Sequence, residues 1–132
     1  MAVEVEVTAL RVSPEDSCPI EAELTLGVDF AVDTDLAAAR WELRYIADHA
    51  HCRHVVELGQ TETRALAKGA HTHEHTVRDF GVSGLSKAVI VNVGLLVLTL
   101  HDGASELLQI SLVVQVLEKD GVVHRIVLNP ME

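Results

Sequence analysis

The sequence has few aromatic residues, and this limits how a core can be built. Its 132 residues include only four aromatic side chains, Phe30, Trp41, Tyr45 and Phe80. A hydrophobic core must therefore consist mainly of valine, leucine, isoleucine and alanine, and the abundance of valine favours β-structure. The length corresponds to a single domain covering residues 1–132.

Cysteines and long apolar runs are scarce as well. Cys18 and Cys52 show no disulfide-type spacing, and the start "MAVEVEV" lacks the basic segment of a secretory signal. We therefore expect a reducing location, in the nucleus or the cytoplasm. The longest apolar run, residues 88–100, is shorter than the roughly 20 residues that a membrane helix needs. The sequence thus predicts a central strand there and no membrane contact.

Catalytic motifs are missing from the sequence. It contains no GxSxG, no HExxH and no glycine-rich phosphate loop. Cys52 has His51 and His54 close by in sequence, but neighbouring residues of a strand face opposite sides, so a structural thiol is the simpler interpretation than a Cys–His nucleophile. We expect a protein that is not an enzyme and that binds no cofactor.

Positive charge is scarce, because 20 acidic residues stand against 10 basic ones, a net charge of −10. The first 35 residues hold nine acidic side chains and only Arg11 as a base. Such a field repels nucleic acid and attracts basic proteins, and it also keeps a protein soluble. We therefore expect no direct nucleic-acid contact, and the charge alone leaves solubility and a basic protein partner as alternatives.

The sequence does contain the apolar–polar alternation of antiparallel sheets. It runs over residues 3–12, 20–32 and 40–47, and Asp102-Gly103 and Asp120-Gly121 mark hairpins. Residues 59–69 have no alternation and predict a loop. About eight strands between turn signals predict an all-β sandwich of antiparallel strands. The predicted core consists of Ile20, Leu24, Leu26, Val28, Phe30, Trp41, Leu43, Val93, Leu95 and Val97.

The strand predicted over residues 106–117 has two different faces. The alternate residues from Leu108 to Val116 are all apolar, and we expect that set to face the core. The other set is mixed and is expected at the surface: Leu107, Gln109, Ser111, Val113 and Gln115.

Histidines are concentrated in the stretch "AHTHEHTV". If it is a strand, His71, His73 and His75 share one face. That face has three interpretations: a metal site, a pH switch or an exposed polar face. A zinc site needs about four ligands. The second histidine-rich stretch, "HAHCRH", offers no fixed-spacing pair to complete one, and a switch needs a bistable partner element. We therefore expect an exposed strand face without bound metal.

Several stretches in this order resemble the anti-silencing histone chaperone family. They are "VTALRVSPEDSCPIEAELTLGVDF", "ARWELRYI" with its Trp-x-Leu-x-Tyr pattern, "VIVNVGLLVLTLHDG" and "ELLQISLVVQV". The similarity runs from about residue 5 to about residue 117. It implies an immunoglobulin-like β-sandwich that is a monomer. It also implies that the protein binds a basic core-histone dimer of histones three and four during nucleosome assembly or disassembly.

The resemblance also implies where a partner is held. In that family an Arg and a Tyr after the hairpin and a Val before it grip the histone, and Gln109, Val113 and Gly94 occupy those positions here. Leu107 and Ile46 complete the partner-binding set that the resemblance implies. Because the three gripping positions have other residue types, the alternative is a β-sandwich adaptor that binds no histone.

Overall fold

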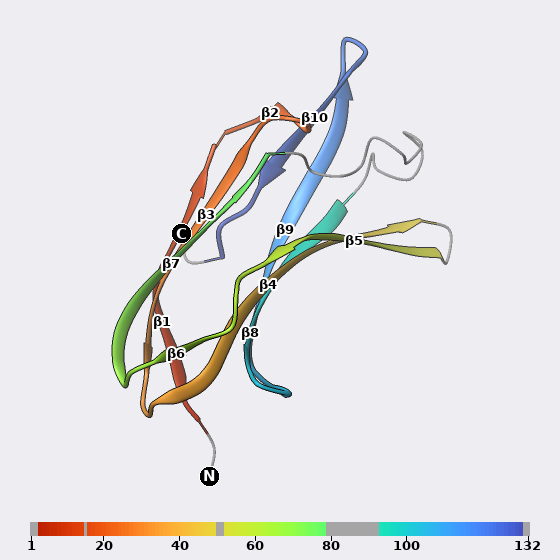
Figure 1. Cartoon of the computed structure of the whole chain (residues 1–132). Helices are drawn as coiled ribbons and strands as arrows, with labels where there is room; N and C mark the ends of the chain where they lie inside the picture. Colours follow the sequence, from red (N-terminus) through yellow and green to blue (C-terminus); the bar gives the residue numbers. More distant parts are fainter. Residues whose placement is uncertain (1–2, 15, 50–51, 79–92, 131–132) are drawn as a thin grey trace.

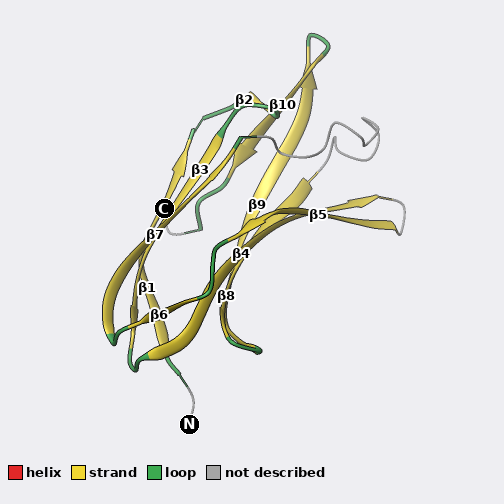
Figure 2. Ribbon diagram, viewed as in Figure 1, coloured by secondary structure: helices red, strands yellow, loops and turns green. Residues whose placement is uncertain are grey.

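The computed structural model describes residues 3–14, 16–49, 52–78 and 93–130 (Figure 1). These residues form ten strands and no helix, in two antiparallel sheets that pack face to face (Figure 2). The predicted all-β sandwich of antiparallel strands is therefore confirmed. Within this part of the chain, no helix has the length and apolar character needed to cross a membrane.

The two sheets differ in size. The smaller sheet has three strands in the order β1-β3-β7, with the bounds β1 Val5–Ser13, β3 Leu24–Val32 and β7 Gly69–Val77. The larger sheet has the order β2-β10-β9-β8-β4-β5, and the short strand β6 pairs with β4. Its bounds are β2 Cys18–Pro19, β4 Leu36–His49, β5 Cys52–Gln60, β6 Arg64–Leu66, β8 Val93–Asp102, β9 Ser105–Lys119 and β10 Val122–Val127.

The core lies between the sheets and is built from alternate residues of each strand. In β3, Leu24, Leu26 and Val28 are fully buried, as its period-2 pattern requires. Eight of the ten predicted core residues are buried; the exceptions are Val93 and Leu95, which are 53% and 36% exposed. The prediction for these two is wrong because the core-facing residues of β8 are Gly94, Leu96, Leu98 and Leu100; Val97 shares the face of Val93 and Leu95 but is itself buried.

Strand β9 has the two faces that its sequence predicts. Leu112, Val114 and Val116 are buried, whereas Gln109, Ser111, Val113 and Gln115 are exposed. Leu107 departs from the prediction, because it is partly buried and packs against the core. A register shift in the β8–β9 hairpin, between Leu100 and His101, brings Leu107 and Leu108 both to the core side.

The segment predicted as a loop, residues 59–69, contains the end of β5 and the whole of β6. Leu66 pairs with Leu36 and is 8% exposed, so this short strand helps to close the end of the sandwich. Its three residues are too few to show alternation in the sequence. The first part of the long apolar run, residues 88–92, lies outside the described residues.

Candidate functional site

Four aliphatic residues form a row across the solvent-facing side of the larger sheet. Ile46 of β4 pairs with Val55 of β5 and with Leu95 of β8, and Leu95 pairs with Val113 of β9. All four side chains point away from the core, and Val55, Leu95 and Val113 are 48%, 36% and 38% exposed. We call these four residues the outer apolar row.

The apolar surface continues beyond the outer apolar row. Val93 lies two residues before Leu95 on the same face of β8 and is 53% exposed. The backbone N–H of Leu128 donates to the carbonyl of Val113 at 2.8 Å, and Leu128 is 43% exposed. Single exposed apolar residues are ordinary, but a contiguous set across neighbouring strands is typical of a binding surface.

A charged cluster lies beside the outer apolar row, toward the β8–β9 hairpin. The Nε2 atom of His101 lies 3.4 Å from the Glu42 carboxylate, and the Nε atom of Arg44 lies 3.7 Å from it. These side chains are only 16–29% exposed, so they are held in the sheet surface. An apolar centre with a polar border is the usual composition of a protein–protein interface.

The structure places the five predicted partner-binding residues in three environments. Ile46 and Val113 are members of the outer apolar row, and Gln109 is exposed on the same face, paired with Thr99. Leu107 packs against the core. Gly94 is buried on the core side, where a Cβ would collide with the Tyr45 side chain.

Leu95, rather than Gly94, therefore lies beside Val113 on the solvent-facing side. The sequence resemblance assigned Gly94 by alignment with the family, and in the structure the residue paired with Val113 is the next one along β8. Val55 was also missed in the sequence. The sequence does indicate its direction. Arg53, Val55 and Glu57 are alternate residues of one strand, and the two charged side chains place this face, with Val55, on the outside.

The three histidines of β7 face into the sandwich, so the predicted exposed face is wrong. In the β3–β7 pairing, His71, His73 and His75 lie beside Phe30, Val28 and Leu26, which are buried. His73 is 8% exposed and stacks on Trp41, with ring centroids 5.2 Å apart and planes within 5°. The outward positions of β7 are Ala70, Thr72, Glu74 and Thr76.

Burial favours the neutral imidazole of His73 and of His75. Desolvation, with smaller contributions from the charges of His75 and Arg64, lowers the pKa of His73 to about 4. Desolvation also lowers the pKa of His75. A neutral imidazole packs as a flat aromatic ring, and this explains how a histidine-rich strand contributes to the core.

No metal centre emerges from the part of the chain that the structure describes. There, no group of three His, Cys, Asp or Glu side chains converges to hold an ion. The side chains of the second histidine-rich stretch, His49, His51, Cys52 and His54, lie outside the described set. No protein-family model matches the chain, and no curated protein matches it either.

Proposed function

We propose that this protein is a histone-chaperone-like binding module that docks a basic core-histone dimer on the outer apolar row. The observation that carries the proposal is the exposure of Val55, Leu95 and Val113 in register with Ile46 across four strands. A monomer gains nothing from apolar side chains at such positions, whereas a partner that covers them does.

The dimensions of the row support a helical partner. Four adjacent strands span about 14 Å, from the spacing of about 4.8 Å between neighbours. A helix with its side chains is about 10–12 Å wide. One amphipathic helix therefore covers the row, and its polar flank comes to lie beside the cluster of Glu42, Arg44 and His101.

The charge of the protein supports a basic partner. The net charge of −10 is concentrated in the first 35 residues, whose two long strands are β1 and β3. These strands belong to the other sheet, so their charge acts at long range and raises the rate of encounter with a basic protein. Contact on the outer apolar row then supplies the affinity.

An adaptor that binds a different protein is the second candidate. It is favoured by the composition of β9, in which residues 105–119 contain no Arg and no Tyr. Gln109 and Val113 therefore cannot make the charged and phenolic contacts of the family that the sequence resembles. The same face would then bind a partner with a more aliphatic surface.

A binding assay with purified histones separates the two candidates. The dimer of recombinant histones three and four is passed over immobilised protein at moderate salt, with the variants Leu95→Asp and Val113→Arg beside the wild type. We expect the wild type to retain the dimer. Both variants should lose affinity at least about tenfold, since a charge at the centre of an apolar interface is desolvated without a partner.

Thr76→Arg is the matched control. Thr76 is exposed on β7 of the opposite sheet. This variant therefore adds the same positive charge as Val113→Arg, but away from the outer apolar row, and it should bind as the wild type does. A wild type that retains no histone supports the adaptor. Equal binding by all four proteins would show that histones contact another surface.

A further inference from the structure

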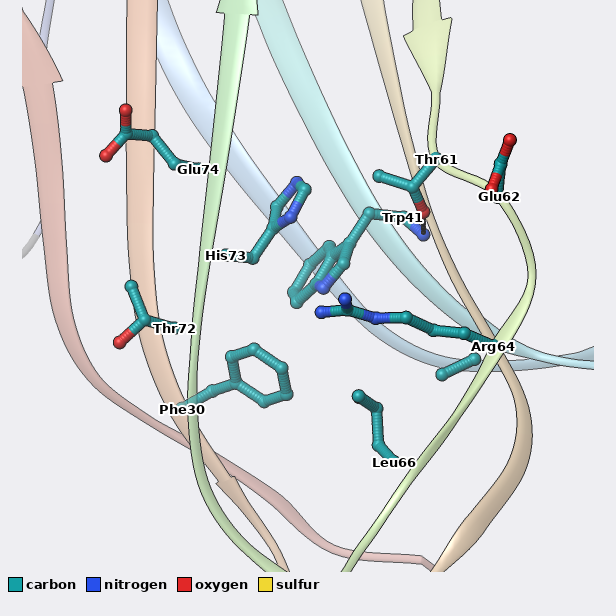
Figure 3. Close-up of a pocket in the computed structure, with 10 residues that line it drawn as sticks. Phe30, Trp41, Thr61, Glu62, Arg64, Leu66, Thr72, His73 and Glu74 are labelled. Carbon is teal, nitrogen blue, oxygen red and sulfur yellow. Dashed lines mark hydrogen bonds between the residues drawn. The ribbon is translucent and has the colours of Figure 1, made fainter.

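A cavity opens between the two sheets beside strand β6, far from the outer apolar row. Its volume is about 400 Å³, enough for a small organic molecule. The rings of Phe30 and Trp41, with Leu66, form its apolar wall, and Arg64 and His73 project toward its interior (Figure 3). This combination of a flat apolar wall and a charged group directed toward it is typical of a ligand site.

Arg64 supplies the only uncompensated positive charge in this cavity. It shares a face of β6 with the buried Leu66, and its side chain extends from β6 toward the Trp41 side chain (Figure 3). Glu62 and Glu74 also line the cavity, but within the described chain neither forms an ion pair with Arg64, and both carboxylates point away from it (Figure 3). A guanidinium without a counter-ion is well suited to receive a carboxylate.

His73 supplies a buried atom that lacks a hydrogen-bond partner. Its side chain is more than nine-tenths buried, and Nε2 has no partner among the described residues. Less than 1 Å² of this atom is accessible, so His73 lines the cavity with other atoms of its ring. Stacking on Trp41 fixes the ring and therefore the direction of this atom.

We propose that this cavity, which we call the inter-sheet pocket, binds a small organic monocarboxylate with an apolar body. The carboxylate accepts hydrogen bonds from the Arg64 guanidinium, and the body packs on Trp41 and Phe30. The His73 ring lines the inter-sheet pocket beside this body.

Charge distinguishes a monocarboxylate from other ligands. His73 is neutral at pH 7, so Arg64 is the single cation that points into the inter-sheet pocket. One guanidinium matches one carboxylate, whereas a phosphate carries more charge and more acceptors than these residues can satisfy. An amine would meet the guanidinium directly and be repelled.

Trp41 makes the proposal directly measurable, because it is the one tryptophan in the sequence. Its fluorescence is followed while the full-length protein is titrated with cyclohexanecarboxylate, which does not absorb at the exciting wavelength. Cyclohexanemethanol and cyclohexylamine serve as the neutral and cationic probes. We expect a saturable change with the carboxylate at about millimolar dissociation constant, typical of so small a ligand, and none with the amine.

Two charge-removing variants test the role of Arg64. Arg64→Gln should weaken cyclohexanecarboxylate binding at least tenfold and leave any response to cyclohexanemethanol unchanged. Lys68→Gln is the matched control, since Lys68 is an exposed cation four residues along that does not line the pocket, and it should bind as the wild type does. Both positions are exposed, so neither variant threatens the fold.

Each outcome of the titrations either supports or overturns the proposed carboxylate site. Loss of the carboxylate response in Arg64→Gln alone supports the proposal. It is overturned if the wild type shows no saturable response, if the amine and the carboxylate act alike, or if Arg64→Gln still binds.

Discussion

The inner face of β7 and the outer face of the larger sheet both differ from the usual pattern of apolar residues inside and polar residues outside. The inner face carries three imidazoles, with His73 only 8% exposed. The outer face carries Val93, Leu95 and Val113, all more than a third exposed. Buried polar residues and exposed apolar sets are the informative departures from ordinary patterning. In this protein the first adjoins the inter-sheet pocket and the second forms the outer apolar row.

The two departures have different physical costs. Burying histidine costs little while the ring stays neutral and stacks on another aromatic ring, as His73 does on Trp41. Exposing leucine and valine gives up stabilisation that burial would provide, about 25 cal/mol for each Å² left in water. The cost of the buried histidine therefore depends on pH, whereas the cost of the exposed leucine and valine side chains depends on whether a partner covers them.

Two leucines of β8 that lie three residues apart, Leu95 and Leu98, give the sharpest test of which face is buried. Leu98 is fully buried and Leu95 is 36% exposed. Leu98→Ala should lower the free energy of unfolding by about 2–5 kcal/mol, because it leaves a cavity in the core. Leu95→Ala should lower it by less than about 1 kcal/mol. Urea unfolding followed by circular dichroism measures both, and equal losses would contradict the assignment of the faces.

Acid should destabilise the protein through the histidine face. The unfolded His73 takes up a proton near its usual pKa of 6.5, whereas the folded one resists protonation to about pH 4. The stability that neutral His73 provides is therefore complete above pH 6.5 and declines as the pH falls toward 4, by about 3 kcal/mol in all. His75 adds in the same direction, since its pKa is lowered too.

Urea midpoints at pH 7 and pH 4.5 measure this loss. His73→Phe should remove most of it, because the phenyl ring keeps the stack on Trp41 and cannot be protonated. His124→Gln, in β10 outside the histidine face, is the control and should keep the full pH dependence. If His73→Phe loses as much stability in acid as the wild type, the acidic side chains cause the effect.

Gly94 marks the point where the two faces of β8 are easiest to confuse. A Cβ there would overlap the Tyr45 side chain, whose burial also raises the pKa of its hydroxyl to about 12. Gly94→Ala should therefore destabilise the fold by about 1–3 kcal/mol. Val93→Ala, on the exposed face next to it, should cost less than about 0.5 kcal/mol. A neutral Gly94→Ala in thermal unfolding would show that Tyr45 moves aside freely.

Much of the fold could be predicted from the sequence, because alternation is a local signal. The pattern from Leu24 to Val32 and the mixed and apolar sets of β9 specify their faces by themselves. The three-residue strand β6 is too short to leave such a signal. Its existence depends on pairing with β4 far away in the sequence.

The candidate sites could be predicted only in part, because they depend on pairing between strands. Ile46 and Val113 came from the resemblance, but Leu95 joins them through a register that a shift in the hairpin sets. The histidines were assigned to an exposed face because the sequence shows neither a metal-ligand spacing nor a bistable partner element for them. Their direction follows from pairing with the buried residues of β3, which no pattern within "AHTHEHTV" reveals.

The smallest expected change in the free energy of unfolding is that of Val113→Arg, a variant that also tests partner binding. Val113 is 38% exposed and Val114 is fully buried, so neighbouring positions of β9 separate the two faces. Val113→Arg should change the free energy of unfolding by no more than about 0.5 kcal/mol, because the guanidinium stays in water. Val114→Arg should prevent folding, because the same charge would enter the core unpaired. If Val113→Arg keeps its stability and loses its partner, the exposed valine serves binding and not folding. If it unfolds, the strand faces are reversed and the outer apolar row belongs to the core.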